Sequence, residues 1–136
     1  MNNRIDAEIS PAALNSIQQG LDAIKNGLPF LVKLADDERK AMALMDDGLR
    51  PFVEKSFELG ARNASIDPGP GLIDAGKKDL DLFIALNSIK VDLEQLIEMV
   101  RDTKQLAGAE AFETARFIYE SSNGCKNERT RLPIPC

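Results

Sequence analysis

The stretch from Lys77 to Ser122 contains no strong helix breaker and keeps one apolar rhythm throughout. Apolar residues recur at alternating steps of three and four, which places them on one side of an α-helix. These positions are Leu82 or Phe83, Leu86, Ile89, Leu93, Leu96, Val100, Thr103 and Ala107. A single helix of this length would extend for about 69 Å, which exceeds the compact size expected of such a chain. The sequence therefore predicts that the chain folds back at Gly108 and that a last helix covers Glu110 to Ser122.

The N-terminal part of the chain carries a second stripe of the same kind. Ser10 followed by Pro11 is a typical helix start, because the hydroxyl caps a free N–H and proline is tolerated in the first turn. The stripe consists of Leu14, Ile17, Leu21, Ile24, Leu28, Leu31 and then Leu34 or Ala35. Pro29 lies inside the stripe and removes one helical hydrogen bond. Since the stripe continues beyond this proline, the pattern predicts a kinked helix that ends near Val32.

Two shorter helices are predicted in the middle of the chain. The acidic residues 36–38 precede basic ones, an order that suits the dipole of a helix. Gly48 and Pro51 then mark the end of one helix and the start of the next, and the segment from Pro51 to Arg62 is amphipathic. Asn63 to Gly76 contains two prolines and three glycines, so a long loop is predicted there.

These periodic segments define the fold class. No segment alternates apolar and polar residues with the period of two that a half-buried strand requires, so an all-α fold is predicted. With 136 residues, 43% of them hydrophobic and 29% charged, the chain is long enough for a core of its own. We expect a single domain over residues 1–122, an antiparallel four-helix bundle with a short extra helix. Residues 123–136 lack periodicity and contain two prolines, so a disordered, flexible tail is predicted.

Charge and apolar content argue against two kinds of partner. The 22 acidic and 17 basic residues give a net charge of −5, which on balance repels nucleic acid and anionic lipid. Apolar runs such as Phe30 to Val32 are only a few residues long, whereas a membrane-spanning helix needs about 20 apolar residues. The first ten residues lack the apolar stretch of a secretory signal. We therefore expect a cytoplasmic protein that binds neither nucleic acid nor membrane. Cys125 and Cys136 are interpreted as free thiols of the tail, with a disulfide as the alternative.

The stretch GPGLIDAGKK, Gly69 to Lys78, is one position short of the phosphate-binding pattern G-x-x-x-x-G-K-[ST]. That pattern works between a buried strand and a helix, and its final hydroxyl binds magnesium. Here a helix is predicted to precede the loop, and Lys78 occupies the hydroxyl position. Asp74 also adds a carboxylate where phosphate would lie. We interpret the stretch as a loop that leads into a helix rather than as a nucleotide site, and magnesium-dependent phosphate chemistry at Lys77 and Lys78 is the disfavoured alternative.

The chain contains no histidine. This absence removes the commonest general base and metal ligand, and with them the usual nucleophile pairs and the Glu-x-x-His sites of helical bundles. Carboxylates one turn apart remain, at Glu94 and Glu98 and at Glu54 and Glu58, but each pair is surrounded by polar residues typical of a solvated helix face. The sequence therefore predicts no catalytic, cofactor-binding or metal-binding residue.

Two residue sets could carry a binding function. Met42, Met45, Phe52 and Phe57 could line an apolar pocket for a ligand or lipid. Ala107, Gly108, Ala111 and Ala115 form a patch of small residues that would let another backbone approach closely, as in a homodimer seam. Packing inside the bundle is the simpler interpretation of both sets, and the binding functions stay open as alternatives.

Three stretches taken together resemble a group of small uncharacterised bacterial all-helical proteins. They are LPFLVKLADDERKAM (Leu28 to Met42), RPFVEKSFELGARN (Arg50 to Asn63) and DLEQLIEMVRDTKQLAGAEAF (Asp92 to Phe112). Members of the group have no assigned activity, so the resemblance implies an all-helical fold and carries no functional residue over to this chain.

Three hypotheses of function follow. The first is a non-enzymatic cytoplasmic helical protein that acts through contacts with a protein partner or by self-association. The second is a carrier of a small apolar ligand or lipid within the bundle core. The third, an enzyme that uses carboxylates alone, is disfavoured because general acid-base catalysis requires paired groups with shifted pKa values and the sequence contains no such pair.

Overall fold

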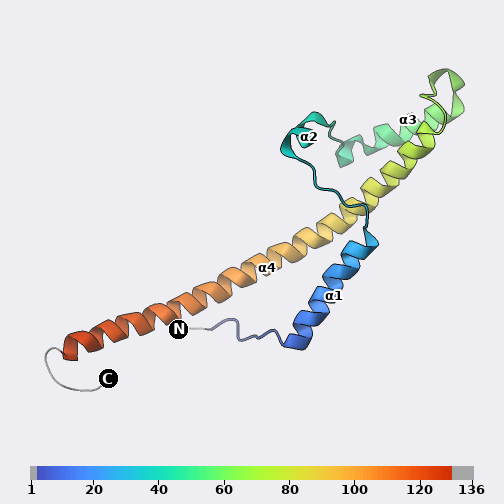
Figure 1. Cartoon of the computed structure of the whole chain (residues 1–136). Helices are drawn as coiled ribbons and strands as arrows, with labels where there is room; N and C mark the ends of the chain where they lie inside the picture. Colours follow the sequence, from blue (N-terminus) through green and yellow to red (C-terminus); the bar gives the residue numbers. More distant parts are fainter. Residues whose placement is uncertain (1–2, 130–136) are drawn as a thin grey trace. The chain divides into compact units, whose positions relative to one another are not determined.

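The computed structural model describes residues 3–129, with side chains described up to Gly124 (Figure 1). Its elements are α1 (Pro11–Gly27), α2 (Asp36–Ala41), the 3₁₀ turn η1 (Asp47–Leu49), α3 (Arg50–Arg62), the 3₁₀ turn η2 (Ala64–Ile66) and α4 (Leu72–Arg129). No strand occurs among the described residues, so the predicted all-α class is confirmed. The chain divides into two compact units. We call Ser10–Ile89 the hairpin unit, and Met1–Ile9 together with Lys90–Cys136 the shaft unit.

Helix α1 begins where the sequence predicts and ends earlier. The Ser10 hydroxyl accepts a hydrogen bond from the Ala13 N–H at 3.1 Å, and Pro11 occupies the first turn. The helix ends at Gly27, and Leu28 leaves the helical region with φ −126° and ψ 60°. Proline disfavours the helical conformation of the residue before it, so Pro29 stops the helix at this point. The predicted kinked helix to Val32 is therefore wrong, because the proline outweighs the apolar stripe.

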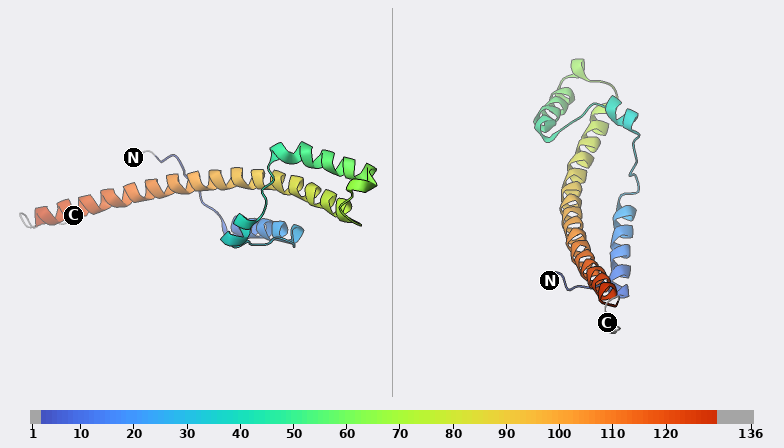
Figure 2. Two further views of the ribbon diagram at one scale, coloured as in Figure 1. Left: turned by 90° about the horizontal axis from the view of Figure 1, so that it is seen from above. Right: turned by 90° about the vertical axis from the view of Figure 1, so that its left-hand side faces the viewer.

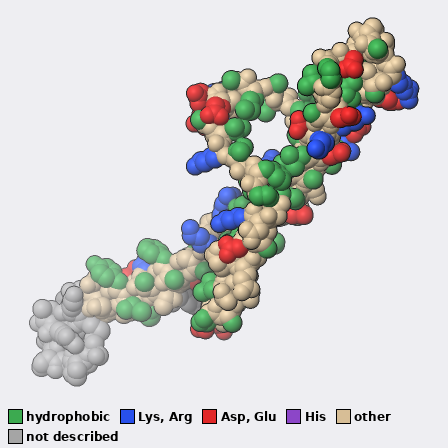
Figure 3. Space-filling model, turned by 45° about the vertical axis from the view of Figure 1, so that its right-hand side comes forward, with side chains coloured by type: hydrophobic (Ala, Val, Ile, Leu, Met, Phe, Trp, Pro, Cys, Tyr) green, Lys and Arg blue, Asp and Glu red, His purple; other side chains and the backbone are tan. Residues whose placement is uncertain are grey.

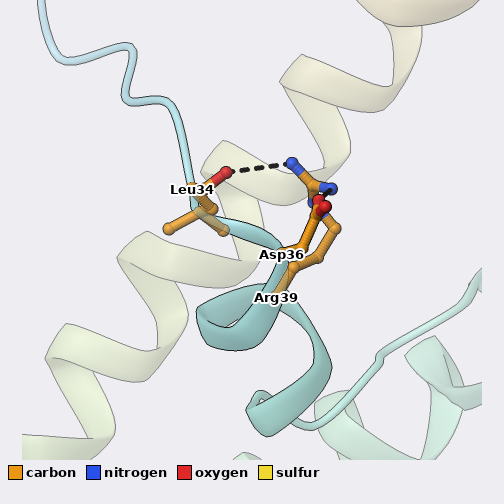
Figure 4. Close-up of polar contacts among 3 residues, drawn as sticks. All are labelled: Leu34, Asp36 and Arg39. Carbon is orange, nitrogen blue, oxygen red and sulfur yellow. Dashed lines mark hydrogen bonds and ion pairs between the residues drawn. The ribbon is translucent and has the colours of Figure 1, made fainter.

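Helix α2 is held at its start by one arginine side chain (Figure 4). The Arg39 guanidinium donates to the Asp36 carboxylate at 2.9 Å and to the Leu34 carbonyl oxygen at 3.1 Å. The acidic first turn and basic last turn match the predicted order of charges. The helix ends at Ala41, where Met42 already adopts an extended backbone, so the predicted continuation to Gly48 is wrong. A helix of six residues makes few internal hydrogen bonds, so it has little stability that would favour further turns.

Helix α3 follows the predicted pattern closely. The Asp46 carboxylate accepts from the Leu49 N–H at 3.0 Å and caps the preceding turn η1. Pro51 then lies in the first turn of α3, where a missing N–H costs nothing. On the polar side, Glu54 pairs with Arg50 at 2.9 Å, one turn earlier in the helix. The helix predicted over residues 51–62 is thus confirmed to within one residue.

The loop between α3 and α4 is shorter than predicted and is built on two glycines. Gly69 and Gly71 have φ values of +144° and +74°, which residues with a side chain rarely adopt. The Asp67 carboxylate accepts from the Gly69 N–H at 2.9 Å and supports the turn. These glycines reverse the chain, so that α4 begins at Leu72 rather than at Lys77.

Within the hairpin unit, α3 and the first turns of α4 lie side by side (Figures 1 and 2). Gly76 of α4 lies directly under the Phe57 ring, because a Cβ atom placed on Gly76 would be 2.7 Å from Cζ of Phe57. A Cβ atom on Gly60 of α3 would likewise be 3.0 Å from Cδ1 of Ile73. Leu80, on the same part of α4, is 9% exposed. Two glycines therefore allow the two helices to approach closely around a small core.

Helix α4 continues without a break through Gly108 to Arg129. The predicted turn at Gly108 and the predicted separate helix from Glu110 are therefore wrong. A glycine inside a helix costs about 1 kcal/mol relative to alanine, which the good helix formers around it tolerate when no proline or N-cap follows. The helix also passes the predicted end at Ser122. Of the predicted flexible tail, residues 130–136 lie outside the described part of the chain.

The predicted four-helix bundle is not confirmed. A bundle would need α1 to bury its apolar stripe and α4 to be two helices. The stripe of α1 is exposed at Leu14, Ile17, Leu21 and Ile24. Helix α4 is one element of 58 residues. What the structure forms within one chain is the hairpin of α3 with the start of α4.

Candidate interaction surface

One side of α4 in the shaft unit carries an exposed row of apolar and small side chains, which we call the α4 face. Its residues follow one another at steps of three, four and seven, so they lie on the same side of the helix. They are Leu93, which is half-buried, and the exposed residues Leu96, Val100, Ala107, Ala111 and Ile118. Val100 is 60% exposed and Ile118 is 62% exposed. Hydrophobic side chains are visible at the surface of this part of α4, next to the grey residues in Figure 3.

The other side of this helical segment is charged and polar. It carries Glu94, Glu98, Arg101, Asp102, Gln105, Glu113, Arg116 and Glu120. Two ion pairs are formed between side chains one turn apart, Lys90 with Glu94 at 3.6 Å and Arg116 with Glu120 at 3.9 Å. All four of these side chains are well exposed, and such pairs contribute only about 0.3–0.5 kcal/mol each. Charged side chains are therefore concentrated on the side opposite the α4 face, and their ion pairs contribute little stabilisation.

Further apolar side chains lie near the C-terminal end of the shaft unit. Phe112, Phe117 and Tyr119 are all exposed, and Tyr119 is the single tyrosine of the chain. Aromatic side chains dominate the energetics of many interfaces, because they bury a large area with little loss of conformational freedom. Phe112 and Tyr119 lie four residues before and three residues after Arg116, so apolar surface also occurs on the polar side of α4 near this end.

The small-residue patch named from the sequence, Ala107, Gly108, Ala111 and Ala115, lies along this same segment, and all four residues are exposed. The turn that would have packed them internally does not exist, because α4 is continuous there. A Cβ atom placed on Gly108 would have no atom within 4 Å. The patch is open at Gly108, and its small side chains would allow a second helix to approach the α4 backbone closely.

A contact at Glu110 joins the two chain segments of the shaft unit, the N-terminal residues and α4. The Arg4 N–H donates to Oε1 of Glu110 at 2.6 Å, and the Ile5 N–H donates to Oε2 at 3.4 Å. Ile5 and Glu110 are both half-buried, in a part of the chain that is otherwise largely exposed. Sequence reasoning missed this contact, because main-chain donors in an extended segment leave no pattern of residue types.

The four residues proposed for an apolar pocket lie on three segments of the hairpin unit and differ in exposure. Phe57 packs on Gly76, and Phe52, earlier on α3, is 70% exposed. Met42 is exposed at the end of α2, and Met45 is half-buried in the segment before η1. The structure gives Phe57 a role in the helix contact, and a pocket formed by the four residues stays a prediction.

The glycine-rich loop lines an open hollow of about 200 Å³ at the start of α4. The hollow is lined by Ala61, Asp67, Gly69, Gly71, Ile73, Asp74 and Lys77. Two carboxylates face one ammonium group there, so the hollow carries net negative charge. The structure gives its glycines other roles, since Gly69 and Gly71 form the turn and Gly76 packs against Phe57. The glycines that resemble a phosphate loop are thus explained by the turn and the helix contact of the hairpin.

Two further searches concern the described residues alone. Among residues 3–124, whose side chains the structure describes, no group of three or more histidine, cysteine, aspartate or glutamate side chains could hold a metal ion. Across the same range, no helix combines the length and the apolar content needed to cross a bilayer.

Comparison of the chain with protein-family profiles, with curated proteins and with solved structures finds no significant match. The exposed apolar side chains of the α4 face are the feature on which we base the proposed function.

Proposed function

We propose that this chain is a non-enzymatic helical protein that acts through protein contacts, and that it makes these contacts by self-association along the α4 face. One observation carries the proposal: a row of aliphatic side chains, with Val100 at 60% exposure, lies open along the part of α4 that belongs to the shaft unit. Amphipathic helices are stabilised mainly by burial of their apolar side. A surface of this kind marks an interaction site in a folded protein.

The energetics favour burial of this face in an assembly. Covering an exposed aliphatic side chain stabilises by about 1.5–3 kcal/mol, whereas an exposed ion pair contributes at most about 0.5 kcal/mol. The two ion pairs of the shaft unit therefore cannot replace the missing apolar contacts. Pairing with a second copy would bury Leu96 and Val100 and would let Ala107 and Ala111 bring the two backbones together. The helical bundle expected from the sequence would then form between copies rather than within one chain.

Charge favours a parallel pair. One edge of the α4 face is basic, with Lys90 and Lys104, and the other edge is acidic, with Asp92 and Glu110. In a parallel pair of helices, the basic edge of one copy lies beside the acidic edge of the other. An antiparallel pair would instead bring like charges together, which is unfavourable.

The proposal is tested by measuring the association constant of the full chain by sedimentation equilibrium, with reductant present to exclude disulfide-linked dimers. Val100→Lys should weaken self-association by about tenfold or more, because it buries an unpaired charge in the interface. Gln105→Lys adds the same charge on the polar side of α4 and should leave association unchanged. Equal effects of the two variants would overturn the proposal.

The parallel arrangement has its own test, in a background in which Cys125 and Cys136 are replaced by serine. Leu96→Cys should then form a disulfide between copies upon mild oxidation, because equivalent residues of the α4 face lie opposite each other in a parallel pair. Glu98→Cys, on the polar side, serves as the control and should stay reduced. Failure of Leu96→Cys to cross-link in an associated sample would exclude the parallel pair.

A further inference from the structure

We propose that residues 3–9 are an intramolecular strap, held on α4 by Glu110, that competes with the second copy for one edge of the α4 face. This inference rests on the proposed function, and it adds a means of regulation to it. We call residues 3–9 the N-terminal arm. The arm belongs to the shaft unit, whereas Ser10, the next residue, caps α1 and belongs to the hairpin unit.

The contact has the form of a clamp on the main chain. Both oxygens of the Glu110 carboxylate are used, one for the Arg4 N–H at 2.6 Å and one for the Ile5 N–H at 3.4 Å. Hydrogen bonds to a charged acceptor are stronger than neutral ones. The half-burial of Ile5 shows that the arm lies against the protein at this point. The two main-chain donors hold an extended segment, and the side-chain amide of Asn3 also donates to Oε2 of Glu110.

The clamp lies at the edge of the α4 face. Glu110 is next to Ala111 in the sequence and one turn after Ala107, so its side chain leaves the helix beside both of them. Packed helices are separated by about 8–10 Å, and small residues bring them to the lower end of this range. That spacing leaves no room for an extended chain between the helices. The arm and a second helix therefore cannot both occupy this edge.

The strap is weak enough to be displaced. It has no regular secondary structure, and the two hydrogen bonds to Glu110 are at a solvent-accessible site. Hydrogen bonds of this kind make a modest net contribution, equivalent to about a two- to tenfold change in an equilibrium constant. Releasing the arm should therefore strengthen self-association by a factor in this range, because the second copy no longer has to displace it.

The experiment compares the full chain with two kinds of variant that release the arm. Glu110→Gln weakens the acceptor, and Glu113→Gln is its control, with the same change of charge on the polar side of α4. Arg4→Pro removes one donor without touching α4, and Ala7→Pro is its control in the same arm. Sedimentation equilibrium gives the association constant of each, and hydrogen exchange measured by NMR gives the protection of the Arg4 and Ile5 amides.

The strap proposal predicts two linked results. The Arg4 and Ile5 amides should be protected in the parent chain and should lose protection in Glu110→Gln. Self-association should strengthen about two- to tenfold in Glu110→Gln and Arg4→Pro and stay unchanged in both controls.

Three outcomes would overturn the proposal, and they are distinguishable. Unchanged association in Glu110→Gln, with the α4 face still required, would overturn the strap alone. Weaker association in Arg4→Pro, which leaves the acidic edge of the α4 face unchanged, would show that the arm supports the assembly and would overturn the strap; weaker association in Glu110→Gln alone would show that Glu110 serves the acidic edge rather than the strap. Absence of association in every variant would overturn the proposed function and the strap's regulatory role together, while the exchange of the Arg4 amide would still report whether the arm is docked.

Discussion

Two of the three glycines of helix α4, one in each unit of the molecule, have completely different surroundings. Gly76 lies under the Phe57 ring, where an added Cβ atom would be 2.7 Å from Cζ. Gly108 has nothing within 4 Å of the same added atom. The first glycine is a packing requirement of the hairpin, whereas the second leaves open a surface of the shaft unit. One helix thus serves as a packed element in one unit and presents an unpaired face in the other.

The largest difference between the two units is expected when one apolar side chain in each of them is shortened. Leu80→Ala should destabilise the hairpin by about 2–4 kcal/mol, because Leu80 is its buried apolar residue. Leu96→Ala removes the same atoms from an exposed site and should cost far less in a dilute, monomeric sample. Urea denaturation followed by circular dichroism measures both. Similar losses would show that the shaft unit is packed as well as the hairpin.

Gly76→Ala tests the helix contact itself. The added methyl group meets the Phe57 ring, and such overpacking costs about 1–3 kcal/mol, from which the better helix propensity of alanine recovers up to about 1 kcal/mol. We expect a net destabilisation of about 1–2 kcal/mol in thermal unfolding. Combining it with Phe57→Leu, which removes the ring, should recover part of the loss. A stabilised Gly76→Ala chain would contradict the close approach of the two helices.

Gly108→Ala should act in the opposite direction. Because the site is open, only the helix propensity changes, and the shaft unit should gain about 0.5–1 kcal/mol. The expected result is slower exchange of amides near residue 108, measured at a concentration where the chain is monomeric. Gly76→Ala provides the matched substitution in the same helix. Faster exchange would show that this segment of α4 is not a regular helix in solution.

The smallest effect is expected on the polar side of the shaft unit. Glu120→Gln breaks the ion pair with Arg116, in which both side chains are mostly exposed. The loss should be about 0.3 kcal/mol and should vanish at high salt. Thermal unfolding at low and at high ionic strength measures it. A salt-independent loss above about 1 kcal/mol would mean that this side of the helix, rather than the α4 face, carries stabilising contacts.

Local signals in the sequence predict several elements well. The Ser10-Pro11 start of α1, the acidic start of α2 and the extent of α3 are all confirmed, because each depends on a cap, a charge order or a proline within a few residues. The end of α1 was misjudged because its apolar stripe was given more weight than Pro29. That stripe remains exposed, so burial offers nothing to offset the proline.

Features that depend on distant residues could not be predicted. The break expected at Gly108 followed from an assumption of compactness, which fails when a helix keeps an unpaired face. The role of Gly76 requires knowledge that Phe57 lies across from it, and the Glu110 clamp depends on main-chain donors that carry no residue signature. For the small-residue patch, the sequence identified the residues, and the structure leaves them exposed. Their role in association stays a prediction.

The position of Tyr119 has a practical consequence for all of these measurements. The chain contains one tyrosine and no tryptophan, and that tyrosine lies exposed on α4 in the shaft unit. Intrinsic emission excited near the tyrosine band therefore comes from the shaft unit alone, while the hairpin emits nothing in this range. Anisotropy or quenching of this tyrosine reports on assembly along α4 without any label, whereas circular dichroism reports on the helices of both units together.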